Sequence, residues 1–218
     1  MNDIVMLGPQ GSGKGTQSSA LSEKLGLPHI SLGTLFRTEV QDGTDIGREI
    51  KGYIERGDIV PAAIASSVIT SRLSKGDAAN GVILDGFPRT LEQADMLDNI
   101  LGQLGRKLAH VIYLNVSDDE ALKRLSGRRV CTNTACERNY HLEYHPPVKP
   151  GVCDRCGSPL AQRKDDTPEA IKHRLSLYHS ETAPLIALYI GTGLLREIDG
   201  QRTIDAVQAD ILSAVGKA

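Results

Sequence analysis

A glycine-rich stretch near the start of the chain has the residue types and spacing of a phosphate-binding loop. It reads GPQGSGKGT over residues 8–16, which follows the pattern G-x-x-x-x-G-K except that Gly15 separates the lysine from Thr16. Glycines let backbone N–H groups turn toward an anion, and a helix that begins there adds partial positive charge. Lys14 is placed to reach the β- and γ-phosphates of a nucleotide, and Thr16 to approach a phosphate-bound Mg²⁺. The stretch predicts a nucleotide site in which Gly11, Ser12, Gly13 and Gly15 also face the phosphates; the alternative is a turn that binds nothing.

Asp85 directly follows a strand-like apolar run and precedes Gly86. A carboxylate at the end of a buried strand beside a phosphate loop can orient water molecules that Mg²⁺ keeps in its coordination shell. Gly86 would let a ligand approach the backbone closely. The alternative for Asp85 is a simple turn residue.

Several arginines are candidates for phosphate contacts. Phosphoryl transfer requires positive charge around the transferring group and exclusion of water from the site. The guanidinium group suits this role because its planar fork matches phosphate oxygens and it stays charged. The candidates are Arg37, Arg89, Arg128, Arg163 and Arg174. The alternative for each one is a solvated surface charge.

All four cysteines lie in one segment with the spacing of metal ligands. Four residues separate Cys131 from Cys136, sixteen separate the two pairs, and two separate Cys153 from Cys156. Four thiolates bind zinc tetrahedrally in closed, structural sites, and a short segment without a hydrophobic core benefits from such a crosslink. The cysteines predict a structural Zn²⁺; free or disulfide-paired cysteines are the alternative, although cytosolic thiols usually stay reduced.

The elements that must position these residues alternate between strands and helices. Apolar runs predict strands at 4–7, 82–84, 110–116 and 194–198. Helical patterns run from the loop to about residue 25 and over 62–74, 90–104, 118–126, 168–189 and 203–215. Ser117 with Glu120 fits a capping box, and Thr167-Pro168 fits a helix start. This order predicts an α/β fold with a parallel sheet covered by helices on both faces.

Two segments interrupt the alternation and predict insertions into this core. Residues 31–60 are largely helical with regularly placed glycines, and residues 127–166 hold the cysteines and many arginines. We therefore expect a core domain made of residues 1–30, 61–126 and 167–218, a helical domain at 31–60, and a small domain at 127–166.

Composition excludes several classes of function. The chain has 218 residues, of which 40% are hydrophobic and 24% charged, as in ordinary globular proteins. A formal net charge of −2 gives no basic field for nucleic acid or a membrane surface. There is no signal-peptide pattern and no apolar stretch near the roughly 18 residues that span a bilayer. We expect a cytoplasmic protein.

Segments spread along most of the chain resemble the adenylate kinase family, in its long-lid, zinc-binding form. The matching segments are GPQGSGKGTQ at 8–17, ISLGTLFR at 30–37, GDIVP at 57–61, DGFPRTLEQA at 85–94, GRRV at 127–130, QRKDD at 162–166, Arg174, and Asp199-Gly200 with Arg202. The resemblance implies a P-loop NTPase-like core, a nucleoside-monophosphate-binding insertion at 31–60 and a zinc-bound lid at 127–166. It also implies reversible transfer of a phosphoryl group from MgATP to AMP, giving two ADP, by a protein that is usually a monomer and serves adenine nucleotide homeostasis.

The resemblance also implies roles for individual residues. For ATP it implies the loop residues 11–16 with Arg124, Arg128, Asn139, Tyr140 and Arg202. For AMP it implies Leu32, Arg37, Asp58, Ile59, Val60, Gly86, Phe87, Pro88, Arg89, Gln93, Arg163 and Arg174. The residues expected at the transferring phosphoryl are Lys14, Asp85, Arg89, Arg128, Arg163 and Arg174.

Two of these roles have alternatives, and one segment departs from the family pattern. Gln93 either reads the adenine of AMP or completes a capping box with Thr90. Tyr140 either touches the ATP base or packs inside the lid. The usual Ser-Thr-Gly-Asp reads Ser-Leu-Gly-Thr at residues 31–34. Leu32 and Thr34 thus replace a hydroxyl near the AMP base and a carboxylate near magnesium.

Three other functions are alternatives to this interpretation. The first is a UMP/CMP kinase, or a kinase with another triphosphate donor. The second is a nucleotide-gated zinc module that binds nucleic acid, which the scarcity of aromatic residues disfavours: six Tyr, two Phe and no Trp. The third is an ATPase switch, which needs no second nucleotide pocket and so would not explain residues 85–93.

Overall fold

The computed structural model describes residues 3–133, 136, 138–163 and 165–216. Two sets of residues from the predictions lie outside this part of the chain. They are the ends of the predicted core domain, residues 1–2 and 217–218, and Lys164 near the C-terminal end of the predicted lid. A five-stranded parallel sheet in the order β2-β3-β1-β4-β8 forms the centre. Its strands are β1 Asp3–Leu7, β2 His29–Ser31, β3 Ile83–Asp85, β4 Leu108–Asn115 and β8 Leu195–Asp199. All four predicted strands are confirmed within two residues, and β2 is an additional edge strand.

The register of the sheet brings the ends of three strands together. Asp85 at the end of β3 lies beside Met6 of β1 on one side and beside Ser31 of β2 on the other. Parallel strands all present their carboxyl ends at one edge, where ligands of open α/β sheets bind. The glycine-rich loop, Asp85 and the start of residues 31–60 therefore meet at this edge.

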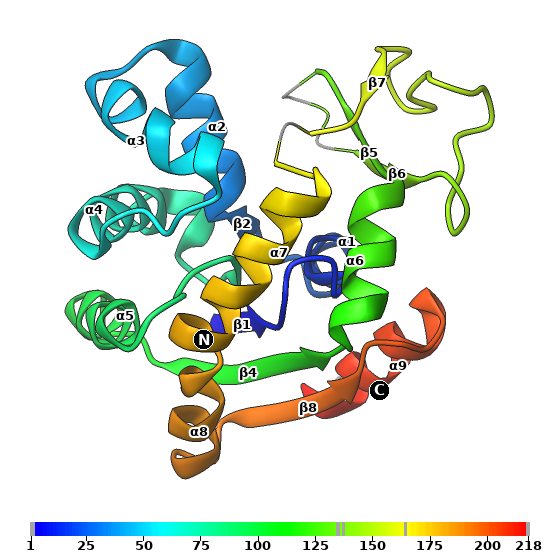
Figure 1. The fold of residues 1–218 in the computed structure, drawn as a ribbon. Helices are drawn as coiled ribbons and strands as arrows, with labels where there is room; N and C mark the ends of the chain where they lie inside the picture. The colour runs from blue at the N-terminus through cyan, green and yellow to red at the C-terminus, as the bar shows by residue number, and fades with distance from the viewer. Residues whose placement is uncertain (1–2, 134–135, 137, 164, 217–218) are drawn as a thin grey trace.

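Helices cover both faces of the sheet, as the alternating pattern predicted (Figure 1). Ile4 and Met6 of β1 point into an apolar cluster with helices α1 and α9, whereas Val5 and Leu7 point into the opposite cluster with α4, α5 and α8. The helices are α1 Lys14–Leu25, α4 Ala62–Leu73, α5 Leu91–Gln103, α6 Asp118–Gly127, α7 Pro168–Leu177, α8 Pro184–Gly191 and α9 Ile204–Ala214, with a 3₁₀ turn at Gly76–Ala78.

The prediction of one continuous helix over 168–189 is wrong. This segment consists of α7, a π-helical segment at Tyr178–Thr182 and α8. Proline at 184 lacks the N–H that a continuous α-helix needs there, and the backbone instead bonds from Ala183 N to Tyr178 O at 2.8 Å. The predicted helix starts are confirmed, because the Ser117 and Thr167 hydroxyls accept the N–H groups of Glu120 and Ala170.

The segment at 31–60 folds as a helical hairpin of α2 Leu32–Asp42 and α3 Asp45–Arg56. Ser31 and Thr44 cap the two helices with their hydroxyls. Phe36, Ile50 and Val60 are buried in the same apolar cluster as α4 and α5. The hairpin therefore packs on the core and does not have a separate hydrophobic centre.

The segment at 127–166 forms a small antiparallel sheet in the order β6-β5-β7. Its strands are β5 Arg128–Cys131, β6 Asn139–His141 and β7 Leu160–Ala161. Helix α6 leads into this segment and α7 leads out of it, and Figure 1 shows α7 between the hairpin and the small sheet. Across the described residues, no helix is long and apolar enough to cross a membrane.

Candidate active site

The glycine-rich loop joins β1 to α1 and lies against neighbouring backbone. A Cβ at Gly8 would lie 2.6 Å from the carbonyl oxygen of Leu114, and one at Gly11 would lie 2.7 Å from that of Ala121. Lys14 is the first residue of α1, and its ammonium donates to the carbonyl oxygens of Gly8 at 2.7 Å and Pro9 at 2.8 Å. The side chain thus folds back over its own loop, where a phosphate group would lie.

The environment of Lys14 is electrostatically unusual. Burial lowers the pKa of its ammonium to about 8; Asp85 opposes this shift, while Arg89, Arg174 and Arg128 add to it. Those three arginines come from the turn after β3, the helix after the lid and the first lid strand. The fold therefore concentrates positive charge from distant parts of the chain on one loop.

Asp85 is the negative group at this site. Burial opposes its ionisation, but the interaction with His29 and the positive charges of Lys14 and Arg89 outweigh burial and hold the carboxyl pKa below its ordinary value. The ring Nε2 of His29 lies 3.6 Å from the Asp85 carboxylate. Sequence reasoning missed His29, because β2 is too short and too polar to stand out as a strand.

The turn after Asp85 holds Arg89. The Phe87–Pro88 peptide bond is cis, and Phe87 is fully buried. Arg89 folds back so that its Nε donates to the carbonyl oxygen of Gly86 at 3.0 Å. Burial lowers the pKa of this arginine, and the charges of Asp85 and Asp165 partly offset the effect.

Gln93 connects this turn to the end of the helical hairpin. Its backbone N–H donates to the Thr90 hydroxyl at 3.2 Å, which is one half of the predicted capping box. Its side-chain oxygen accepts the N–H of Arg89 at 2.8 Å instead of the N–H of Thr90, and its Nε2 points to the carbonyl oxygen of Val60 at 3.5 Å. The amide therefore aligns Arg89 with the predicted base-binding segment.

A cavity of about 400 Å³ lies where these elements meet. It is lined by Asp58, Ile59, Val60 and Gln93 together with Tyr53, Pro61, Ala62, Thr90, Glu92, Leu177 and Glu181. Four of the residues predicted for AMP thus share one cavity. The Asp58 carboxylate also accepts from Arg56 at 2.7 Å and contacts His173 of α7 at 2.8 Å.

Two further residues predicted for AMP lie in the first turns of α2. The guanidinium of Arg37 donates to the Thr34 hydroxyl at 2.9 Å. The Leu32 side chain is only 2% exposed and belongs to the main apolar cluster. This placement favours packing over base contact for Leu32.

Three predicted arginines meet two aspartates at the base of the lid. Arg128 binds the Asp166 carboxylate through two nitrogens, at 2.8 and 2.6 Å. Arg163 forms the equivalent forked pair with Asp165. Arg174 donates to the Asp165 carbonyl oxygen at 2.9 Å and lies 3.2 and 3.3 Å from the two carboxylates. Sequence reasoning quoted these aspartates only as part of the lid boundary, although a DD pair beside an arginine is the signal of such a cluster.

The two arginines predicted near the ATP base are placed differently. Arg124 donates to the carbonyl oxygen of Gly200 at 2.9 Å and lies 3.5 Å from that of Ser12, so it joins α6, the phosphate loop and the turn after β8. Arg202 pairs with Asp210 of α9, with half of its side chain exposed. The structure brings Arg124 to the loop, and gives Arg202 a partner on the surface of α9.

The four cysteine sulfurs form one cluster within the lid. All four sulfur atoms lie within 4.8 Å of one another, with 3.4 Å between Cys131 and Cys156 and 3.6 Å between Cys136 and Cys153. These separations rule out disulfide bonds in the structure, where the described cysteines are free. Zinc bound tetrahedrally at about 2.3 Å holds its thiolates about 3.8 Å apart, so the cluster fits this ion.

Tyr140 supports the cysteine cluster. Its side chain is 5% exposed, and its hydroxyl accepts the N–H of Asp154 at 2.8 Å and lies 3.5 Å from the Cys153 sulfur. This placement favours the packing alternative for Tyr140. Asn139, its neighbour in β6, is exposed.

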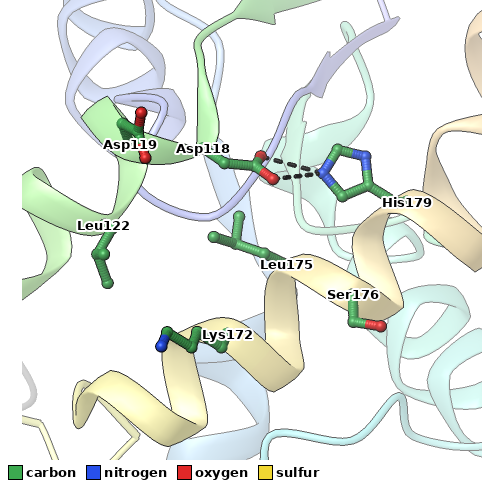
Figure 2. Close-up of a pocket in the computed structure, with 7 residues that line it drawn as sticks. All are labelled: Asp118, Asp119, Leu122, Lys172, Leu175, Ser176 and His179. Carbon is green, nitrogen blue, oxygen red and sulfur yellow. Dashed lines mark hydrogen bonds and ion pairs between the residues drawn. The ribbon is translucent and has the colours of Figure 1, made fainter.

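A second hollow, of about 340 Å³, lies between α6 and α7 (Figure 2). It is lined by Asp118, Asp119, Leu122, Lys172, Leu175, Ser176 and His179, and an exposed Asp118–His179 pair at 2.9 Å crosses its edge. None of the predicted site residues lines it, so the chemistry belongs to the edge of the sheet.

Comparison with known proteins gives one family. A family model described as adenylate kinase matches residues 6–194. The adenylate kinase of Geobacillus sp. (strain WCH70) is 45% identical over 214 residues, covering 98% of this chain and 98% of that protein. The adenylate kinase of Syntrophotalea carbinolica is 47% identical over 213 residues, with 98% of each chain covered. That of Lachnospira eligens is 42% identical, covering 98% of this chain and 99% of its own.

Proposed function

The chain belongs to the adenylate kinase family and converts ATP and AMP into two ADP, and we propose that the edge of the sheet described above is where it does so. The observation that carries this proposal is that the charges of Arg89, Arg128 and Arg174 all act on Lys14, with Asp85 as the opposing negative charge. Phosphoryl transfer depends on placement and charge neutralisation, which such a set of fixed cations supplies.

On the donor side, residues 11–16 bind the phosphates of ATP. The backbone N–H groups of the loop and the start of α1 surround them, and the ammonium of Lys14 turns from the Gly8 and Pro9 carbonyls to the phosphate oxygens. Mg²⁺ carried by ATP neutralises charge on the phosphates. The ionised carboxylate of Asp85 and the Thr16 hydroxyl are the residues that would hold its water shell, and Arg124 and Asn139 lie toward the ATP base.

On the acceptor side, AMP occupies the region between the cavity and the turn after β3. Arg37 and Arg89 bind its phosphate, while Gln93 and the backbone of residues 58–60 contact its base. Gly86 and the cis Phe87–Pro88 bond shape the turn that carries Arg89.

The arginines at the base of the lid complete the site. Arg128, Arg163 and Arg174 are paired with Asp165 and Asp166, so a transferring phosphoryl group competes with carboxylates for them. This arrangement keeps the arginines clustered between catalytic cycles, because each has a charged partner when phosphate is absent. Closure of the lid over the phosphates would exclude water and prevent ATP hydrolysis.

A structural Zn²⁺ held by Cys131, Cys136, Cys153 and Cys156 stabilises the lid. In the described part of the chain, the side-chain contacts of the cysteine sulfurs include one another and Tyr140, and none of the arginines of the site. Zinc therefore supplies shape and no chemistry. We also propose the domain division given by the sequence, with residues 31–60 and 127–166 as the two insertions, and a cytoplasmic monomer as the working state.

The test of this site is substitution of its cations. Lys14→Met abolishes ADP formation, and Arg89→Ala reduces kcat by about 10³-fold, the scale of a transition-state arginine, while also raising KM for AMP. Arg48→Ala is the matched control, because Arg48 lies on the hairpin with two thirds of its side chain exposed. Near-normal turnover by Lys14→Met, with thermal unfolding unchanged in all variants, would contradict the assignment of the active site to this edge of the sheet.

A further inference from the structure

The position of Arg37 depends on a residue that departs from the family pattern. We propose that Thr34 is a positioning residue for Arg37: its hydroxyl holds the guanidinium in the orientation that receives the phosphate of the acceptor nucleotide. This inference rests on the role proposed above for Arg37.

The first turn of α2 supplies the geometry. The Ser31 hydroxyl accepts the N–H of Thr34 at 3.4 Å and fixes Thr34 in that turn. Arg37 is three residues further on, so the two side chains share a face of the helix, and Arg37 Nη2 donates to Thr34 Oγ1 at 2.9 Å. Because threonine is β-branched, its χ1 in a helix is restricted mainly to two rotamers. The rotamer found here directs Oγ1 to the Arg37 guanidinium.

Gly33 leaves the space that the guanidinium occupies. A Cβ at this position would lie 3.2 Å from Arg37 Nη1. Arg89 lies over Gly86 in the same manner, with 3.3 Å between its Nη2 and a Cβ built there. Ser31 is in register with Asp85, so these two turns are neighbours at the edge of the sheet. Both arginines are thus folded over a glycine on adjacent elements, an arrangement compatible with binding one phosphate through both guanidinium groups.

The Thr34 hydroxyl is a neutral partner for Arg37, in contrast to the carboxylates at the base of the lid. Arg128 and Arg163 each form a forked pair with a carboxylate, which an incoming phosphate must displace. The Thr34 hydroxyl orients Arg37 without neutralising its charge, so that contact need not be exchanged when AMP binds. Loss of this hydrogen bond should therefore affect AMP binding more than the chemical step.

The test compares Thr34→Val, which keeps shape and removes the acceptor, with Thr34→Ser, which keeps the hydroxyl. KM for AMP rises about fivefold in Thr34→Val, the scale of one lost hydrogen bond, while kcat and KM for ATP change less, and Thr34→Ser restores most of the difference. Thr38→Val, an exposed threonine on the same helix, is the control. In the Arg37→Ala background, Thr34→Val adds nothing, because the hydroxyl acts through the guanidinium.

The outcomes separate this inference from the function on which it rests. If Arg37→Ala raises KM for AMP but Thr34→Val does not, Thr34 is not a positioning residue. An effect of Thr34→Val that persists in the Arg37→Ala background overturns it as well. If Arg37→Ala itself leaves KM for AMP unchanged, the assignment of Arg37 fails first and the inference with it. Thermal unfolding of each variant shows that the fold is intact.

Discussion

Lys14 has an unusual environment for a charged side chain. Its hydrogen bonds go to carbonyl oxygens of its own loop, and three arginines add to the effect of burial on its pKa. Phosphate oxygens would replace those carbonyls as partners and add negative charge, which favours the protonated ammonium. The state of Lys14 thus depends on whether nucleotide is bound.

This dependence predicts the effect of pH on the reaction. Because the pKa of Lys14 is about 8 in the free protein, the lysine loses its proton as pH rises through that value, and kcat/KM for ATP should fall there. The profile of kcat should stay level to higher pH, because it reports the nucleotide-bound protein, in which phosphate retains the proton. Steady-state rates from pH 6.5 to 10 test this. A kcat/KM profile that is flat to pH 9.5 would contradict the environment described for Lys14.

At the scale of elements, the base of the lid depends on Asp166. Its side chain is fully buried and accepts from Arg128, with Arg174 also in contact. Replacing it with Asn removes the carboxylate that Arg128 binds and leaves Arg174 with Asp165 alone, and breaking a buried pair costs several kcal/mol. Since a fifth of the Arg128 side chain is exposed, we expect a loss near the lower end, about 2–3 kcal/mol of unfolding free energy.

Urea denaturation of Asp166→Asn measures this loss. Asp77→Asn is the matched control, because Asp77 forms the same forked pair with Arg72 but more than half of its side chain is exposed. Exposed pairs contribute little, so the control should change several times less. Equal losses in the two variants would show that Asp166 has no special role at the base of the lid.

The cysteine cluster predicts that the lid depends on metal separately from the core. We expect about one Zn²⁺ per chain, because four thiolates complete one tetrahedral site. Chelation should increase hydrogen exchange in residues 127–166 before it does so in β1, since metal binding is local folding free energy. Activity should fall less than lid stability, and added zinc should restore both. Protein prepared without chelator and found free of metal by elemental analysis would refute the zinc site.

The elements show how far the sequence could predict the structure. Strands β1, β3 and β4 were predictable because each contains an apolar run that is mostly buried. Strand β8 was located by Leu195 and Ile198 together with Leu194 before it, although only Ile198 of its five residues is buried. Strand β2 was not, because two of its three residues are polar and its place is set by pairing with β3. The division of α7 from α8 was missed because both halves share a helical pattern. Periodicity reports which face is buried and does not report a local change in backbone hydrogen bonding.

The candidate site was predictable in its membership and less so in its contacts. The motifs located Lys14, Asp85 and the arginines because glycine and arginine spacing follows directly from phosphate chemistry. The partners Asp165 and Asp166, the contact of His29 with Asp85, and the burial of Tyr140 depend on which segments meet in space. Such tertiary contacts leave little pattern in the sequence.

On the scale of the whole molecule, α7 connects the two inserted segments. His173 contacts Asp58 at the end of the helical hairpin, and the next residue, Arg174, contacts Asp165 and Asp166 at the end of the lid. The cavity proposed for AMP and the base of the lid therefore share one helix. This arrangement fits a reaction in which both nucleotides must be present before the charges are fully neutralised.

Acceptor choice is the property that depends on the whole assembly. In the site proposed above, Gln93 and residues 58–60 contact adenine, whereas the apolar side chain of Leu32 offers the base no hydrogen bond. One absent hydrogen bond weakens discrimination by about fivefold, too little to overturn an amide that pairs with the base edge. We therefore expect AMP to be preferred and pyrimidine monophosphates to react slowly.

The most direct test is the rate of ADP formation from MgATP with each acceptor in turn. The measurement is kcat/KM for AMP, CMP, UMP and GMP with the zinc-loaded wild-type protein. The site described here predicts the highest value for AMP, with CMP and UMP detectable but well below it. A higher kcat/KM for CMP or UMP than for AMP would contradict the adenine-binding role given to Gln93 and to the cavity beside it.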